Sequence, residues 1–331
     1  MTASSQTTTV ETPLLKVRGL RKYFPIKPDL IGRPRARVHA VEDVSFALDK
    51  GETLGLVGES GCGKTTTGRL VIRLIEADAG EIEFEGRDLR KIAQREMRPY
   101  RRDMQFVFQD PFASLNPRLT VGEAIEEGLI VHGLGDRKER RERIAAILER
   151  VGLRPEAMRR HPHEFSGGQR QRIGIARALV LKPKLIVADE PVSALDVSVQ
   201  AQVMNLMLDL QQELGLAYLF IAHDLAAVEY MSARIAVMYL GRLVELADAG
   251  TIVGRPKHPY TQYLLESAPR LEVGKPAQRM RLQGEVPSPI DPPPGCPFHL
   301  RCPKRMRVCE TEVPPLRQVA AGQMAACHLY S

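Results

Sequence analysis

The most informative stretch of this sequence is Gly58-Glu59-Ser60-Gly61-Cys62-Gly63-Lys64-Thr65, which fits the phosphate-loop pattern G-x4-G-K-[ST]. An apolar run at 54–57 precedes it and predicts a strand, and a helical pattern follows it from Thr65 to about Ile75. The glycines let the backbone curl so that successive N–H groups point at phosphate oxygens, with the helix N-terminus behind them. The context therefore predicts a nucleotide site.

Two residues of this loop carry the chemistry. We expect Lys64 to neutralise the β- and γ-phosphates of ATP and Thr65 to hold Mg²⁺ through its hydroxyl. The other predicted ATP-binding residues of the loop are Gly58, Ser60, Gly61, Cys62, Gly63 and Thr66. Cys62 is interpreted as a small loop residue, and a redox-active thiol is the alternative.

A pair of carboxylates follows the apolar run 185–188, which predicts a buried strand. A carboxylate at the carboxyl end of a central strand faces the ligand crevice of an open α/β sheet. We expect Asp189 to bind Mg²⁺, directly or through water, and Glu190 to activate the attacking water as general base. An acidic strand-to-loop turn is the alternative for this pair in isolation.

Farther from the loop, strands alternate with helices. Strands are predicted at 14–18, 44–48, 81–85, 104–108 and 218–222, a mainly helical region at 120–180, and a helix at 197–213. This order favours an α/β fold with a mostly parallel sheet covered on both faces. After about residue 250 the periodicity fades and Pro, Gly, Arg and Cys become dense, which predicts a domain boundary.

The composition is that of an ordinary globular protein: 331 residues, 44% hydrophobic and 26% charged. No run approaches the roughly 18 consecutive apolar residues of a membrane span. Residues 1–10 have no apolar core, so we expect no signal peptide and a cytoplasmic address. The net charge of +7 fits a nucleic-acid surface, an anionic membrane surface or a merely basic protein, and does not decide among them.

The segment between the phosphate loop and the carboxylate pair narrows the choice among families of phosphate-loop proteins. Residues 165–172 read Phe165-Ser166-Gly167-Gly168-Gln169-Arg170-Gln171-Arg172 and run into a helical pattern. This resembles the signature of ABC ATPases, with Phe165 where the family usually has leucine. Gln109 matches the family's Q-loop glutamine, Asp196 the end of its D-loop, and His223 its switch histidine. The resemblance covers residues 14–250.

The resemblance implies roles for these residues. Glu190, His223 and Gln109 act in hydrolysis, Thr65, Gln109 and Asp189 hold Mg²⁺, and an aromatic residue stacks on adenine. Phe24 is the best match for that aromatic residue and Tyr23 is the alternative. Two such domains pair head to tail in the family, so the signature contacts the ATP of the partner. The residues predicted for that contact are Ser166, Gly167, Gly168, Gln169 and Asp196.

The implied fold is an ABC-type P-loop NTPase core, with a mostly parallel sheet, an antiparallel β subdomain and an inserted helical subdomain at about 98–174. Residues 1–13 are expected to be a disordered N-terminus and 14–250 the ATPase domain. Residues 251–331 are expected to be an irregular, Cys-rich C-terminal tail.

Two further segments look like those of oligopeptide/dipeptide importer ATPases: the extended Q-loop at 109–118 and His258-Pro259-Tyr260-Thr261. The second segment is predicted to be a turn before a helix at 261–268, without chemistry of its own. The resemblance implies a peripheral subunit on the cytoplasmic face of the inner membrane of a bacterial cell. It also implies two permease subunits, a second ATPase subunit (a homologous sister or an identical copy) and an extracytoplasmic peptide-binding protein, with no nucleic acid.

Three other functions are weighed against peptide import. The same family also imports other solutes such as nickel or sugars. A soluble ABC ATPase acting on DNA or ribosomes usually carries two cassettes or long insertions, and this chain has neither between Lys64 and Ser166. A non-hydrolysing transporter subunit would lack competent residues, whereas every expected hydrolytic position here keeps one.

Four of the five cysteines gather near the C-terminus, at Cys296, Cys302, Cys309 and Cys327. Clustered thiolates suit a tetrahedral zinc or an iron–sulfur cluster, but the spacing lacks C-x2-C pairs. The resemblance to peptide importer ATPases implies a [4Fe–4S] cluster, with zinc, unligated thiols or disulfides as alternatives. His299 and His328 are alternative ligands that we expect to be bystanders.

Overall fold

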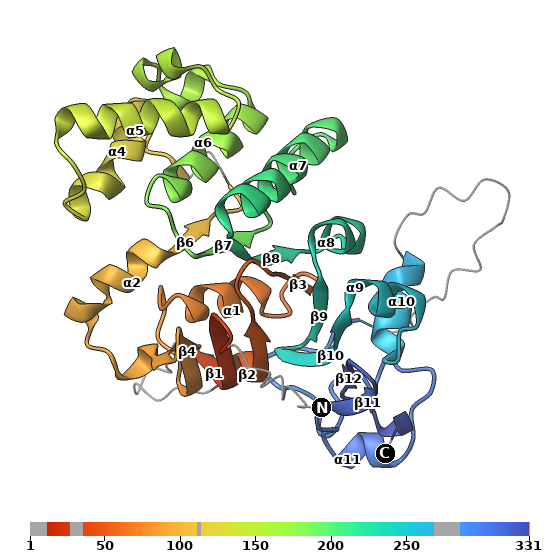
Figure 1. Cartoon of the computed structure of the whole chain (residues 1–331). Coiled ribbons are helices and arrows are strands. Elements are labelled where there is room, and N and C mark those ends of the chain that lie inside the picture. The colour runs from red at the N-terminus through yellow and green to blue at the C-terminus, as the bar shows by residue number, and fades with distance from the viewer. Residues whose placement is uncertain (1–11, 27–35, 111–113, 268–284, 331) are drawn as a thin grey trace, which may run out of the picture.

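The structure is a computed structural model that describes residues 12–26, 36–110, 114–267 and 285–330. The predicted disordered N-terminus therefore lies outside the described residues except for Thr12 and Pro13. Figure 1 shows two sheets at the centre, a group of helices above them and the C-terminal tail beside the lower part of the larger sheet.

The smaller sheet is antiparallel, in the order β2-β1-β4-β5. Its strands are β1 (Leu15–Pro25), β2 (Arg37–Leu48), β4 (Ala79–Phe84) and β5 (Arg87–Asp88). Buried and more exposed residues alternate along parts of these strands, as expected where one face of a sheet packs on a core. This is the predicted antiparallel β subdomain.

The larger sheet has the order β11-β12-β10-β9-β3-β8-β7-β6. Its parallel part consists of β3 (Thr53–Val57), β6 (Met104–Val107), β7 (Leu185–Asp189), β8 (Ala217–Ala222) and β9 (Arg234–Tyr239). Every residue of β3, β7 and β8 is buried, which explains why these strands read as continuous apolar runs in the sequence. The carboxyl ends of β3, β6, β7 and β8 meet at one edge.

Helices cover this sheet. They are α1 (Lys64–Val71), α2 (Arg98–Asp103), α4 (Val121–Val131), α5 (Arg137–Arg150), α6 (Gly167–Leu179), α7 (Val197–Leu214) and α8 (Leu225–Met231). The region predicted as helical divides into α4, α5 and α6 because Gly133, Gly135 and Gly152 adopt left-handed conformations between them. Figure 1 shows these three helices packed together, which is the predicted helical subdomain.

The tail continues the larger sheet. It comprises α9 (Ala249–Gly254), α10 (Pro259–Ser267), α11 (Val308–Thr311), β11 (Arg317–Ala320) and β12 (Gln323–Ala325). The strand β12 pairs with β10 (Arg242–Asp248), which itself pairs with β9. Short 3-10 helices lie at Leu89–Lys91, Gln94–Met97, Pro155–Arg159, Pro162–Glu164 and His328–Tyr330.

A buried carboxylate fixes the junction between core and tail. Glu245 of β10 is fully buried and accepts hydrogen bonds from the backbone N–H groups of Lys257 and His258 and from the side chain of Gln323. These bonds hold the turn that starts α10 and, at the same time, the strand β12. No helix in the described ranges is both long enough and apolar enough to span a bilayer.

Candidate ATP site

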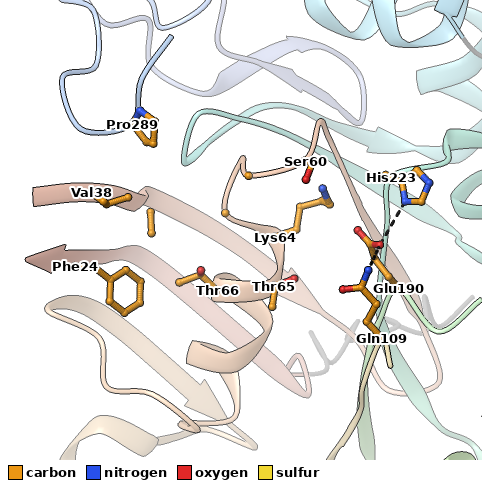
Figure 2. Close-up of a pocket in the computed structure, with 13 residues that line it drawn as sticks. Phe24, Val38, Ser60, Lys64, Thr65, Thr66, Gln109, Glu190, His223 and Pro289 are labelled. Carbon is orange, nitrogen blue, oxygen red and sulfur yellow. Dashed lines mark hydrogen bonds and ion pairs between the residues drawn. The ribbon is translucent and has the colours of Figure 1, made fainter. Parts of the chain in front are cut away.

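A pocket of about 610 Å³ opens at the carboxyl edge of the larger sheet. Figure 2 shows its side chains converging from the phosphate loop, the strand ends and the edge of the smaller sheet. Its lining consists of Phe24, Val38, Ala40, Ser60, Gly61, Gly63, Lys64, Thr65, Thr66, Gln109, Glu190, His223 and Pro289. All of these except Val38, Ala40 and Pro289 were predicted ATP-binding or hydrolytic residues, so the structure brings the distant motifs to one place.

The phosphate loop needs glycine at specific positions. Gly63 has φ +104° and precedes α1, and a Cβ there would lie 2.1 Å from the carbonyl oxygen of Ala40. At Gly58 a Cβ would lie 2.1 Å from the carbonyl oxygen of Met238. No side chain caps α1, which leaves its first N–H groups available to an anion.

Lys64 lies inside this loop. Its ammonium donates to the carbonyl oxygens of Gly58 at 2.7 Å and Glu59 at 3.1 Å, and the residue is 4% exposed. The charge is thus held among backbone groups within a polar pocket. This is the arrangement expected of a cation that receives terminal phosphates.

Thr65 and Asp189 meet beside the loop. The Thr65 hydroxyl donates to Asp189 Oδ1 at 2.8 Å, which joins the start of α1 to the end of β7. Burial raises the pKa of Asp189, and the hydrogen bond from Thr65 opposes that rise. Hydroxyl and carboxylate oxygens are the ligands that Mg²⁺ prefers, so these two residues fit the predicted Mg²⁺ site.

The residues predicted to act in hydrolysis form a second group. Gln109 Nε2 donates to Glu190 Oε2 at 2.8 Å, and His223 Nδ1 lies 3.4 Å from the same oxygen. Glu190 adopts φ +46°, a left-handed conformation that is costly for a residue with a Cβ. Glu190 directly follows β7, and its side chain lines the pocket. Dashed lines in Figure 2 join it to Gln109 and His223. A carboxylate, an amide and an imidazole therefore meet at one place in the pocket.

The structure separates the two aromatic candidates. Phe24 is 38% exposed and lines the pocket. Tyr23 is not a lining residue: its hydroxyl donates to Glu42 at 2.6 Å and its ring packs on His39. Burial and the contact with Glu42 raise the pKa of Tyr23 to about 12. Of the two aromatic side chains, Phe24 is thus the one available for stacking on the adenine base of ATP.

The signature residues lie elsewhere. Ser166 caps α6: its hydroxyl accepts from the Gln169 N–H, and the Gln169 side chain accepts from the Ser166 N–H. Figure 1 places α6 with α4 and α5, away from α1. None of Ser166–Gln169, nor Asp196, lines the pocket formed by the described residues. One chain therefore does not bring its own signature to its own phosphate loop.

Three lining residues were missed by sequence reasoning. Val38 and Ala40 belong to β2, and Pro289 belongs to the tail. The carbonyl oxygen of Pro289 accepts a hydrogen bond from the His39 N–H at 2.8 Å. No local pattern indicates them, because they line the pocket through strand pairing and docking of the tail. Gly58, Cys62 and Asp189, predicted as binding residues, are not among the lining residues.

The prediction of a metal at the C-terminal cysteines gains no support. Among the described residues, no group of three or more His, Cys, Asp or Glu is placed to hold a metal ion. Cys296, Cys302, Cys309 and Cys327 are free thiols. Burial, and after it mainly the neighbouring cysteines, raises the pKa of Cys296 to about 12. This geometry supports neither the cluster nor the zinc alternative.

Together, the P-loop core, the carboxylates of β7, the Q-loop glutamine and a capped signature helix define an ATP-hydrolysing cassette of the ABC type. The comparisons agree. Residues 41–193 match the ABC transporter family, and residues 244–309 match the C-terminal region of oligopeptide/dipeptide transporters. The chain therefore belongs to the ATP-binding subunits of ABC transporters, in the branch that carries this C-terminal region.

Curated relatives match over all or nearly all of their length. The oligopeptide transport ATP-binding protein AppF of Bacillus subtilis is 52% identical, with all of both chains covered. The dipeptide transport ATP-binding protein DppF of Haemophilus influenzae is 50% identical over 96% of each chain. A dimeric ATP-binding cassette, solved in a post-hydrolysis state with ADP and Pi, is 28% identical with a TM-score of 0.63, covering 71% of this chain and 98% of that one.

Proposed function

We propose that this chain is the subunit that hydrolyses ATP to drive import of peptides across the cytoplasmic membrane. The observation that carries the proposal is the tail: its match to the oligopeptide/dipeptide transporter region starts within β10, and its turn at His258 is fastened to buried Glu245. Relatives named for peptide transport or import align along 96% or more of the chain at 50% identity or more.

The site supports a sequence of roles. The phosphate loop and Lys64 bind the phosphates, and Phe24 stacks on the base. Thr65 and Asp189 would hold Mg²⁺, which supplies charge neutralisation at the phosphates when bound. Glu190 takes the proton of the attacking water, while Gln109 and His223 orient that water through the shared carboxylate oxygen.

A second ATPase subunit is part of the proposal. The signature at Ser166 begins a helix whose N–H groups suit a phosphate, yet it does not line the pocket of its own chain. Two chains placed head to tail would close each ATP between the loop of one and the signature of the other. The partner is a sister subunit or a second copy, bound on the cytoplasmic face to two permease subunits.

We also propose that the four C-terminal cysteines ligate a [4Fe–4S] cluster. Burial raises the pKa of each of Cys296, Cys302 and Cys327, and other cysteines of the group add to the rise, so the four thiols lie in one region of the tail, although the described residues form no group already placed to hold a metal ion. Anaerobic purification followed by iron and sulfide analysis tests this: roughly four irons per chain, lost in Cys302→Ser, is the expected result. Stoichiometric zinc without iron would reject the cluster and leave the ATPase assignment intact.

The cargo is tested by uptake in cells. A strain without its own copy of the gene receives wild type or Glu190→Gln, and accumulation of a labelled tripeptide is compared with that of ⁶³Ni²⁺ and a labelled disaccharide. Tripeptide uptake restored by wild type alone is the expected result. Restoration of nickel or sugar uptake instead would identify this chain as the ATPase of another importer of the family.

A further inference from the structure

Glu59, the second residue of the phosphate loop, is bound by the C-terminal tail through two different groups. The Arg301 guanidinium donates to both oxygens of the Glu59 carboxylate, at 2.8 and 3.2 Å. The Glu59 backbone N–H donates to the hydroxyl of Tyr260 at 2.8 Å. The turn at His258–Tyr260, which was predicted to carry no chemistry of its own, thus reaches the phosphate loop through the Tyr260 hydroxyl.

These contacts are well shielded from water. The side chain of Arg301 is 7% exposed and that of Glu59 is 22% exposed, while Tyr260 is fully buried. Burial by itself lowers the pKa of Arg301, but the hydrogen bond to Glu59 reverses this and raises it overall. A bidentate pair at this depth is stronger and more directional than a surface salt bridge.

The two tail residues are themselves held rigidly. The rings of Tyr239, Tyr260 and Phe298 form an aromatic block, with centroids 4.6 to 5.4 Å apart. The Arg301 guanidinium lies 5.9 Å from the Tyr239 ring. His258 Nδ1 accepts from the Tyr260 N–H at 3.1 Å, so the turn bound by Glu245 also fixes Tyr260.

Glu59 connects this block to Lys64. Its carbonyl oxygen accepts from Lys64 Nζ, whereas its side chain does not line the ATP pocket and turns toward the tail. A shift of Glu59 would therefore move both the loop backbone and an anchor of Lys64. Small displacements of groups that meet a substrate cost much of its binding.

We propose that Arg301 and Tyr260 are positioning residues for ATP binding: the tail holds Glu59 so that the phosphate loop keeps the shape that receives the phosphates. The inference rests on the proposed ATP site. It gives the C-terminal tail a direct part in nucleotide binding, separate from any metal at the cysteines.

The test is the dissociation constant of ATP for the full-length chain, measured by fluorescence titration with Mg²⁺. Arg301→Met is expected to weaken ATP binding about tenfold, because the loop loses its lateral support. Tyr260→Phe, which leaves the Glu59 N–H without its acceptor, is expected to weaken it less. The matched control is Arg305→Met, an exposed arginine of the same segment for which affinity stays unchanged.

Charge reversal tests whether the contact between Glu59 and Arg301 itself supports ATP binding. Glu59→Arg and Arg301→Glu should each weaken ATP binding, and the double variant should recover most of it. An unchanged ATP affinity in soluble Arg301→Met, together with a lower unfolding temperature, would overturn the proposal and make Arg301 an anchor of the tail alone. Should Arg301→Met not fold, Arg301→Lys and Tyr260→Phe decide the question, and wild-type affinity in both rejects the proposal. ATP binding retained by Lys64→Ala would instead reject the nucleotide site itself.

Discussion

The Gln109 side-chain amide donates a 2.8 Å hydrogen bond to the Glu190 carboxylate. The two residues follow different parallel strands, β6 and β7, whose ends meet at the same edge of the sheet. His223, which follows β8, approaches the same carboxylate oxygen. Three strand ends thus bring a carboxylate, an amide and an imidazole together, an arrangement that suits the proposed activation of water.

Replacing the proposed general base gives the first prediction. Glu190→Gln keeps the shape of the side chain but cannot accept the proton, so the rate of ATP hydrolysis should fall by about 10²- to 10⁴-fold. ATP affinity should stay within about twofold of wild type, because Glu190 is not proposed to bind the phosphates. The rate of phosphate release measures hydrolysis, and fluorescence titration measures the ATP affinity. Exposed Glu229→Gln serves as control, and hydrolysis unaffected in Glu190→Gln would contradict the assignment.

The contact between Thr65 and Asp189 predicts a specific dependence on Mg²⁺. Thr65→Val preserves volume and removes the hydroxyl oxygen, so Mg²⁺ should no longer strengthen ATP binding as it does in wild type. Titrations with Mg²⁺ and with EDTA give the comparison. If Mg²⁺ enhances affinity equally in both proteins, Thr65 is not a ligand. Thr311→Val, at an exposed position of α11 outside the pocket, is the control.

Phe24 should carry the stacking of the base. Because stacking on an aromatic ring is worth about 1–3 kcal/mol per base, Phe24→Ala should weaken ATP binding by roughly tenfold or more, and Phe24→Trp should retain it. Tyr23→Phe loses only the hydrogen bond to Glu42 and should bind normally. The reverse pattern, with Tyr23 sensitive and Phe24 tolerant, would assign the base to the other face of β1.

The position of Ser166 predicts a separation of binding from hydrolysis. Ser166→Arg puts a bulky cation at the start of α6, outside the chain's own pocket, so a single chain should bind ATP as wild type does. Hydrolysis by the assembled pair should be lost, since the composite site cannot close. Equilibrium binding and turnover of the purified complex are the readouts. Loss of ATP binding by the isolated Ser166→Arg chain would speak against a site shared between subunits.

The buried turn at His258 predicts a dependence of stability on pH. Burial lowers the pKa of His258 from its usual 6.5 to about 3, and its Nδ1 accepts from the Tyr260 N–H. Below pH 6.5 the unfolded chain therefore gains a proton that the folded chain does not. The stability present above pH 6.5 is lost progressively as the pH falls toward 3, by about 2 kcal/mol at pH 5.

Urea unfolding of wild type and His258→Asn at pH 7.5 and 5 measures this loss. Asn keeps an acceptor for the Tyr260 N–H but does not titrate, so the variant should lose about 2 kcal/mol less over this interval. Equal losses in the two proteins would show that other groups cause the pH dependence.

Much of the core could be predicted from sequence because each signal was local. Continuous apolar runs marked β3, β7 and β8, and a glycine-rich stretch followed by a lysine marked the start of α1. Residues directly after such strands must gather at one edge, so Asp189 and Glu190 could be assigned to a site without knowledge of the sheet order, whereas His223 was assigned through the resemblance to the family.

The tail could not be predicted in the same way. The strands β11 and β12 are four and three residues long, too short to show a period; β12 forms by pairing with β10, and β11 by pairing with β12. The contacts of Glu59 with Tyr260 and Arg301 join residues 201 and 242 positions apart. Nothing near Glu59 in the sequence indicates either partner. The place of Pro289 in the pocket has the same cause.

The most direct test of the account is tripeptide uptake into proteoliposomes that contain the purified transporter, with ATP on the side of this subunit and peptide-charged binding protein on the other. Wild type should accumulate the tripeptide only when ATP is present, and Glu190→Gln in the same complex should bind ATP without accumulating it. Uptake at the wild-type rate by the Glu190→Gln complex would contradict the claim that hydrolysis at this site drives import.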